Sequence, residues 1–316
     1  MYAKILLALA AAALSAGVSS KVFAQSPAQS SVWPPSPDHL TMPIWPGKPP
    51  GPAVNLPPET DMNAAKTKMM AGRPYIRLGN VTTPTITVFK PAAKNTGAGI
   101  VVFPGGGYQI LSVDLEGTEI CDWLNQAGIT CVLLKYRVPD TGPYPKSAAA
   151  LQDAQRAVGL VRLHAAEWGI DPHRVGVLGF SAGAHLAAAI STHYDQRVYD
   201  PIDDADKLSC KPDFAVVMYP GYLALADQNF APSPDVHPTA DTPPTFILQA
   251  EDDYTAHVEN AVVYFMELKK EKVPAELHIY AEGGHGFGLR PRDLPIMGWP
   301  KLVETWLHTI KVLPAN

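Results

Sequence analysis

A serine set between closely spaced glycines carries the strongest chemical signal in the sequence. The pentapeptide GFSAG at 179–183 follows the run RVGVL at 174–178 and precedes an alanine-rich stretch. A strand, a sharp turn and a helix in this order expose a serine hydroxyl at the edge of a sheet, and the helix N-terminus favours developing negative charge there. The pattern predicts that Ser181 is a nucleophile on such a turn, the alternative being a plain turn of small residues.

A serine hydroxyl is a poor nucleophile at neutral pH and needs a nearby base. Of the ten histidines, His285 is the preferred candidate because it lies in the glycine-rich run 283–288, soon after a predicted strand that ends at Tyr280. Loops at the carboxyl ends of parallel strands commonly carry the active sites of α/β proteins. His185 is the rival, but it lies one helical turn beyond Ser181, so we expect it to pack or to support the site.

A carboxylate must in turn hold the imidazole in the right tautomer. Three consecutive acidic residues, 251–253, follow the predicted strand 245–250. The first two continue the turn after the strand, which leaves Asp253 to swing toward His285, while Asp252 caps or supports the loop. The resulting chain order of serine, acid and histidine is that of α/β-hydrolases and differs from the orders in trypsin-like and subtilisin-like proteases.

Three consecutive glycines, 105–107, follow the predicted strand 99–103. Backbone N–H groups in such a loop can stabilise the oxyanion of a tetrahedral intermediate. We expect the N–H groups of Gly106, Gly107 and Ala182 to form this oxyanion hole. A phosphate cradle is the alternative, but neither a G-K-[ST] ending nor a G-x-G-x-x-G spacing follows.

Two further features bear on substrate binding. Tyr108 follows the three glycines, where it can line the acyl pocket and bind substrate, or serve as a buried aromatic anchor. The segment 220–243 consists of small, polar and proline residues that cannot build a helical lid. The site should therefore be open, which favours short acyl groups on sugars.

From residue 84 onward, short β-branched apolar runs alternate with segments that carry apolar residues at helical spacing. This alternation is typical of a parallel sheet covered by helices on both faces. We predict the α/β class and, within it, the α/β-hydrolase fold with a mostly parallel central sheet and a minimal lid. The predicted strands are 85–89, 99–103, 130–134, 175–180, 214–219, 245–250 and 275–280. The predicted helices are 116–126, 148–167, 182–192, 258–271 and 301–311.

Asp153 and Arg156 lie three residues apart on the second predicted helix. We expect them to pair with each other or with nearby loop backbone.

The N-terminus has the features of an export signal over residues 1–24. Lys4 supplies positive charge, residues 5–18 form a short apolar run, and VFA at 22–24 offers a cleavage site. An uncleaved membrane anchor is the alternative, which the shortness of the apolar run disfavours. We therefore predict a secreted or periplasmic protein.

Prolines concentrate in residues 25–60, which precede the predicted single catalytic domain at 61–316. Proline-rich chain acts as a semi-rigid spacer. We predict a linker through about Asp38, followed by a strap that packs on the domain.

Composition excludes several classes of partner. The formal net charge of −5 gives no electrostatic attraction for nucleic acid. No apolar run after the signal approaches the roughly 20 residues of a membrane span, so stable membrane insertion is not expected. The three cysteines form an odd set without a CxxC pair. We expect no metal, no cofactor and buried free thiols, with Cys121 and Cys131 as a candidate pair.

Nearly the whole segment from Trp45 to the C-terminus resembles secreted bacterial α/β-hydrolases of the acetyl xylan esterase and feruloyl-esterase-like (BD-FAE-like) group. The resemblance rests on PGGGY at 104–108, on Ser181, on LKYR at 134–137, on DAQRA at 153–157 and on ELHIY at 276–280 leading into His285. In this family the acid is followed, after two intervening residues, by the position that Ala256 fills here, and only Asp253 has that offset. Pro104, Ala184 and residues 255–257 depart from the family's usual residues.

The resemblance and the predicted triad imply a serine carboxylesterase that hydrolyses small acyl esters or acetylated polysaccharide through an acyl-enzyme, with feruloyl as a second acyl group. One alternative is a peptidase of the prolyl oligopeptidase type, although residues 25–84 are too few for its N-terminal propeller. The other is a non-catalytic carbohydrate-binding protein on a hydrolase scaffold, which the Trp- and Pro-rich N-terminus alone supports.

Overall fold

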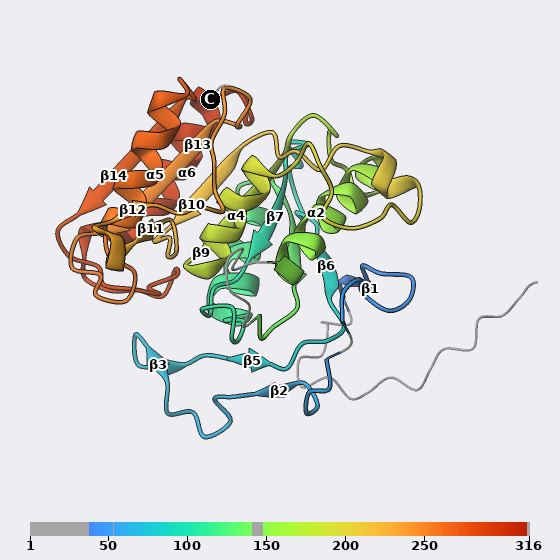
Figure 1. The fold of residues 1–316 in the computed structure, drawn as a ribbon, viewed down its shortest axis with the longest axis horizontal. Coiled ribbons are helices and arrows are strands. Elements are labelled where there is room, and N and C mark those ends of the chain that lie inside the picture. Colours follow the sequence, from blue (N-terminus) through green and yellow to red (C-terminus); the bar gives the residue numbers. More distant parts are fainter. Residues whose placement is uncertain (1–37, 53, 141–147, 315–316) are drawn as a thin grey trace, which may run out of the picture. The chain divides into compact units, whose positions relative to one another are not determined.

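A mostly parallel sheet of eight strands forms the centre of the fold (Figure 1). The computed structural model describes residues 38–52, 54–140 and 148–314, so the predicted signal at 1–24 lies outside the described residues. Across the sheet the strands follow the order β1 (Leu40–Pro43), β6 (Thr85–Phe89), β8 (Thr130–Lys135), β7 (Gly99–Phe103), β9 (Val175–Phe180), β10 (Ala215–Met218), β13 (Thr245–Ala250) and β14 (Ala275–Tyr280). β6 is antiparallel to both β1 and β8, and the strands from β8 to β14 are parallel.

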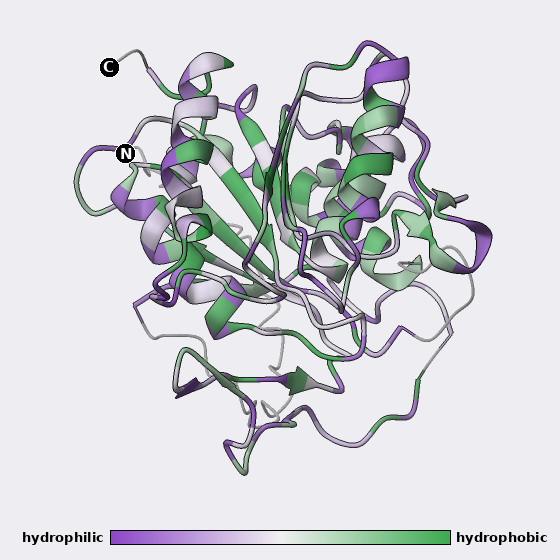
Figure 2. Cartoon of the chain, turned by 90° about the vertical axis from the view of Figure 1, so that its left-hand side faces the viewer, coloured by the Kyte–Doolittle hydropathy of each residue, from purple (hydrophilic) through white to green (hydrophobic). Residues whose placement is uncertain are grey.

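Helices cover both faces of this sheet, and each face has its own buried cluster. One cluster joins the sheet to α2 (Ala148–Leu163), α4 (Ala182–Thr192) and α5 (Glu259–Lys270). The other joins it to α1 (Glu119–Gln126) and α6 (Trp299–Thr309). In Figure 2 the central strands are largely hydrophobic, whereas the helices beside them carry both hydrophobic and hydrophilic residues. The predicted α/β class, with a mostly parallel central sheet covered by helices on both faces, is therefore confirmed.

Complete burial explains why the central strands were readable in the sequence. Every residue of β7, β8 and β9 is buried, because helices lie on both sides. Such strands read as continuous apolar runs bounded by turn residues. β6, β7, β9, β13 and β14 have the predicted bounds.

Two predicted helices are each divided in the structure. The predicted 116–126 helix consists of a π-helical turn, η1 (Asp114–Thr118), and then α1. In η1 the N–H of Thr118 donates to the carbonyl of Val113, five residues back, at 3.0 Å. The predicted 148–167 helix breaks at His164 into α2 and the short α3 (Ala165–Trp168).

The strap contributes a strand and core residues, neither of which was predicted in detail. β1 adds an antiparallel edge to the sheet, and the indole of Trp45 is buried. Its Nε1–H donates to Asp153 Oδ1 at 2.8 Å. Asp153 and Arg156 do not pair with each other, because Arg156 instead donates to the Ile44 carbonyl and pairs with acidic residues at 203 and 206. Both side chains therefore anchor the strap.

Short elements complete the fold outside the central sheet. Two-residue strands form three pairs, β2 (Thr60–Asp61) with β5 (Leu78–Gly79), β3 (Met69–Met70) with β4 (Arg73–Pro74), and β11 (Ala224–Leu225) with β12 (Ala231–Pro232). The 3₁₀ turns are η2 (Asp204–Lys207), η3 (Ala226–Gln228) and η4 (Pro295–Gly298). Segment 220–243, all of it described, contains no α-helix, so the predicted lack of a helical lid is confirmed.

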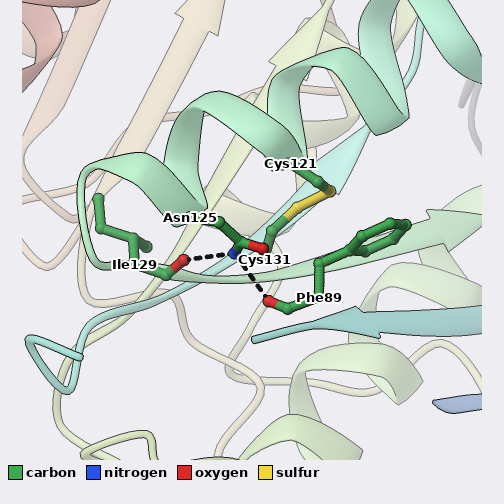
Figure 3. Close-up of a disulfide and its surroundings, with 5 residues drawn as sticks. All are labelled: Phe89, Cys121, Asn125, Ile129 and Cys131. Atoms are coloured by element: carbon green, nitrogen blue, oxygen red, sulfur yellow. Dashed lines mark hydrogen bonds between the residues drawn. A yellow bond between two sulfur atoms is a disulfide. The ribbon is translucent and has the colours of Figure 1, made fainter. Parts of the chain in front are cut away.

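A disulfide joins Cys121 of α1 to Cys131 of β8 (Figure 3). The candidate pair Cys121–Cys131 is therefore confirmed as a disulfide in place of two free thiols, whereas Cys210 is buried and free, as expected. Beside the disulfide, the Asn125 amide donates to the carbonyls of Phe89 and Ile129, which fixes the end of α1 (Figure 3).

No helix in the described parts of the chain is long and apolar enough to cross a membrane.

Candidate active site

Ser181 lies on a strained turn between β9 and α4. Its backbone angles, φ 54° and ψ −117°, are values that residues other than glycine rarely adopt. The flanking glycines are sterically required, because a Cβ on Gly179 would lie 1.9 Å from the Gly183 carbonyl oxygen. A Cβ on Gly183 would lie 2.1 Å from the carbonyl oxygen of Phe103. As the GFSAG sequence predicts, a strand leads through a tight turn at Ser181 directly into a helix.

The structure brings Ser181, His285 and Asp253 into one hydrogen-bonded chain. Ser181 Oγ lies 2.8 Å from His285 Nε2, and His285 Nδ1 lies 2.6 Å from Asp253 Oδ2. With Nδ1–H donating to the carboxylate, Nε2 is left to accept the serine proton. The arrangement can thus generate a serine nucleophile and carry its proton.

The two neighbouring aspartates have different partners. Asp253 is 1% exposed, and its Oδ1 accepts the backbone N–H groups of Thr255 and Ala256, each at 2.9 Å. Asp252 Oδ1 accepts the N–H groups of Gly283 and Gly284 at 2.9 and 2.7 Å. Asp252 therefore braces the loop that carries the imidazole, whereas Asp253 contacts the imidazole itself.

The glycine loop lies beside the serine. Gly106 and Gly107 line the same cavity as Ser181, with φ values of 140° and 63°. The Gly105 N–H donates to Glu116, but the N–H groups of Gly106, Gly107 and Ala182 donate no hydrogen bond to any described residue. These three N–H groups are therefore available for an oxyanion.

Tyr108 does not lie where a substrate-binding role requires. It is 1% exposed, is not among the residues that line the cavity, and stacks on Tyr222, which does line it. Its hydroxyl lies 2.8 Å from Nδ1 of His185, whose Nε2 lies 3.4 Å from Asp235 Oδ1. We correct the substrate-binding prediction accordingly: Tyr108 is the buried aromatic anchor, and the buried His185 supports it, as expected.

Glu116 and Tyr219 form a buried pair that the sequence reasoning missed. Glu116 Oε2 accepts the Gly105 N–H, and its Oε1 accepts the Tyr219 hydroxyl, both at 2.8 Å. The Tyr219 ring packs edge-on against the His285 ring, with centroids 5.1 Å apart. Burial raises the pKa of Glu116, although the hydrogen bond from Tyr219 and the nearby His285 oppose this shift. The only available signal was the position of Tyr219 at the carboxyl end of a predicted strand.

We expect Glu116→Ala to lower both stability and turnover, because it leaves the Gly105 N–H buried without a partner beside the glycine loop. An unsatisfied buried donor costs about 1–3 kcal/mol in the free energy of unfolding. Glu116→Gln should restore most of both properties, since an amide can accept from Gly105 and donate to Tyr219. Chemical denaturation and kcat for an acetyl ester, measured for both variants, test this. Equal losses in the two variants would contradict it.

The cavity in front of Ser181 has a volume of about 700 Å³. Its walls come from distant parts of the chain: Met70, Tyr75 and Arg77 between β1 and β6, 224–227 after β10, and 255–257 with Asn260 around α5. Nothing in the sequence indicated that the segment between β1 and β6 reaches this site.

Comparisons with known proteins agree with this geometry. The BD-FAE family matches residues 86–227. The solved acetyl ester-xyloside bifunctional hydrolase of Caldicellulosiruptor lactoaceticus is 33% identical, with a TM-score of 0.66 over 87% of this chain and 97% of that one. Thermogutta terrifontis esterase 2 with butyrate bound is 26% identical, with a TM-score of 0.64 over 74% of this chain and 92% of that one.

Curated relatives include an acetylxylan esterase of Xylanibacter ruminicola, 32% identical over 205 residues and 61% of this chain. The match spans 42% of that relative, and a further match spans 34% of the endo-1,4-beta-xylanase B of Butyrivibrio fibrisolvens at 28% identity over 63% of this chain. The chain therefore spans less than half of each of these two proteins. Similarity over almost the whole length of the solved hydrolase extends beyond the matched family segment. The chain belongs to the BD-FAE family of α/β-hydrolase esterases.

Proposed function

We propose that the protein is a serine carboxylesterase that removes short acyl groups, acetyl foremost, from plant polysaccharide. The observation that carries the proposal is the hydrogen-bonded chain from Ser181 through His285 to Asp253, which opens into a cavity beside three available N–H groups. A nucleophile, an oriented base and oxyanion donors are the parts that acyl transfer needs.

In the first half of the proposed reaction, Ser181 Oγ attacks the ester carbonyl carbon while His285 Nε2 takes the hydroxyl proton. The tetrahedral oxyanion accepts hydrogen bonds from Gly106, Gly107 and Ala182. The intermediate then breaks its bond to the sugar oxygen, which takes the proton from His285 Nε2 and leaves as the alcohol. The acyl group remains on Ser181.

In the second half, water attacks the acyl carbon and gives its proton to His285 Nε2. The bond to Ser181 Oγ breaks, the serine oxygen takes that proton back, and the carboxylic acid leaves. Throughout, Asp253 keeps Nδ1–H directed toward itself and stabilises the imidazolium that forms in each half.

The proposed substrate class comes from the relatives. The similar proteins include an acetylxylan esterase, a xylanase and an acetyl ester-xyloside hydrolase. These names favour an esterase on acetylated xylan over the peptidase and carbohydrate-binding alternatives.

Acyl length is the first property to test. We expect acetyl and propionyl esters to be hydrolysed fastest, with a steep fall beyond butyryl, because segment 220–243 has no α-helix to form an apolar lid. A series of p-nitrophenyl esters measures this, beside acetylated xylan, methyl ferulate and a proline anilide. Preference for octanoyl or longer esters would contradict the length prediction, and cleavage of the anilide alone would replace the esterase by a peptidase.

We further propose that residues 1–24 direct export and are removed. The Cys121–Cys131 disulfide supports this, because disulfides persist in oxidising compartments. Sequencing the N-terminus of protein recovered outside the cytoplasm tests it, with Gln25 expected and Met1 contradicting removal.

A further inference from the structure

Arg77 lines the active-site cavity without a partner for its guanidinium group. The chain has nine arginines, all in the described residues, and the other eight each donate a side-chain hydrogen bond or form an ion pair. For Arg77 the described residues provide no such side-chain partner. Within the described parts of the chain, this guanidinium group is therefore a cavity-lining cation without a side-chain partner.

The backbone around Arg77 is fixed, so its side chain starts from a defined position. The Arg77 N–H donates to Asp61 Oδ1 at 3.0 Å, and its carbonyl accepts from the Met62 N–H at 2.8 Å. The neighbouring Ile76 N–H donates to Asp114 Oδ1 at 2.8 Å. On the other side, the backbone N–H groups of Leu78 and Leu111 each donate to the other residue's carbonyl. These bonds fix the backbone position from which the side chain reaches into the cavity.

Two acidic residues also line the cavity, but among the described residues neither is hydrogen-bonded or ion-paired with Arg77. The oxygens of the buried Glu116 accept from Gly105 and Tyr219. Asp227 is exposed, where water and salt screen a charge effectively. The Asp61 and Asp114 carboxylates next to Arg77 accept backbone N–H groups and not the Arg77 guanidinium group. The half-buried guanidinium group can therefore bind an anionic group that enters the cavity.

We propose that Arg77 binds a carboxylate of the substrate, so that the preferred esters are acyl groups on a polysaccharide that carries uronic acid residues. A guanidinium group matches a carboxylate in a two-pronged arrangement that neutral sugar hydroxyls cannot reproduce. The inference rests on the proposed esterase function and adds to it the charge of the substrate.

The test compares two acetylated sugars that differ only at C6, methyl glucuronoside with a carboxylate there and methyl glucoside with a hydroxymethyl group, both acetylated at the same ring hydroxyl. We expect the wild-type kcat/KM to favour the glucuronoside by at least about tenfold, and this ratio to fall as sodium chloride is raised. Arg77→Gln should bring the ratio close to one, and Arg77→Lys should keep part of it. Arg73→Gln is the matched control, because Arg73 lies in the same segment between β1 and β6, pairs at the surface with Glu119 and does not line the cavity.

Each outcome decides between the alternatives. Equal hydrolysis of the two sugars by the wild type overturns the carboxylate site without reference to any variant, so a variant that fails to fold does not obscure the result. A drop of equal size for both sugars in Arg77→Gln also overturns it and assigns Arg77 to neutral contacts. Hydrolysis of p-nitrophenyl acetate with no preference between the sugars leaves the proposed function standing, whereas no hydrolysis of any ester overturns both.

Discussion

Ser181→Ala should abolish ester hydrolysis while the protein remains folded. The hydroxyl is the proposed attacking atom, and removing the nucleophile of a Ser-His-Asp hydrolase lowers kcat by on the order of 10⁶-fold. Alanine keeps the Cβ that the turn already accommodates, so no new steric conflict arises at φ 54°. Steady-state kinetics with p-nitrophenyl acetate measure the loss, and thermal unfolding checks the fold.

Ser191→Ala is a suitable matched control for this variant. Ser191 lies on α4, the same helix that follows Ser181, and its buried hydroxyl donates to the Ala187 carbonyl at 2.7 Å, away from the cavity. Its removal should leave turnover close to that of the wild type. Turnover of Ser181→Ala within about tenfold of the wild type would rule out Ser181 as the nucleophile.

Asp253→Asn should cause the second largest loss, about 10⁴-fold in kcat, the magnitude found for the same change in another Ser-His-Asp enzyme. An amide N–H₂ facing His285 Nδ1 favours the tautomer with the proton on Nε2, which then cannot accept the serine proton. The fold should persist, because the amide oxygen can still accept the N–H groups of Thr255 and Ala256.

Asp252→Asn is the control for Asp253→Asn, because Asp252 contacts the loop backbone and not the imidazole. The amide oxygen of asparagine can keep both hydrogen bonds from Gly283 and Gly284, and the side chain has no bond to the imidazole. We expect a far smaller loss of kcat than for Asp253→Asn. If purified, folded variants show the opposite ranking, Asp252 is the acid.

Much of the fold could be predicted because the strands are buried on both faces. β7 and β9 have no solvent-facing residues, so each reads as a run of apolar residues and glycine that ends at a turn. The helix after Ser181 was equally clear, since a serine between glycines after such a run permits little but a tight turn. β1 was missed because it is a four-residue edge strand between proline-rich segments, stabilised by pairing with β6 rather than by its own pattern.

The candidate site likewise has residues that the sequence predicted and residues that it did not. Ser181, His285 and the acidic run 251–253 follow predicted strands of one parallel sheet, and parallel strands bring their carboxyl ends to one edge, so chain order alone predicted that they would meet. The sequence by itself therefore determined the class of fold and the proposed acyl-transfer chemistry. Only the tertiary structure decided whether Tyr108 is a buried anchor or part of the cavity wall. It also decided which residue pairs with Glu116, and that Arg77 lines the same cavity as Ser181. These features depend on contacts between residues far apart in the chain, such as the 103 positions between Glu116 and Tyr219, and no local period or spacing encodes such contacts.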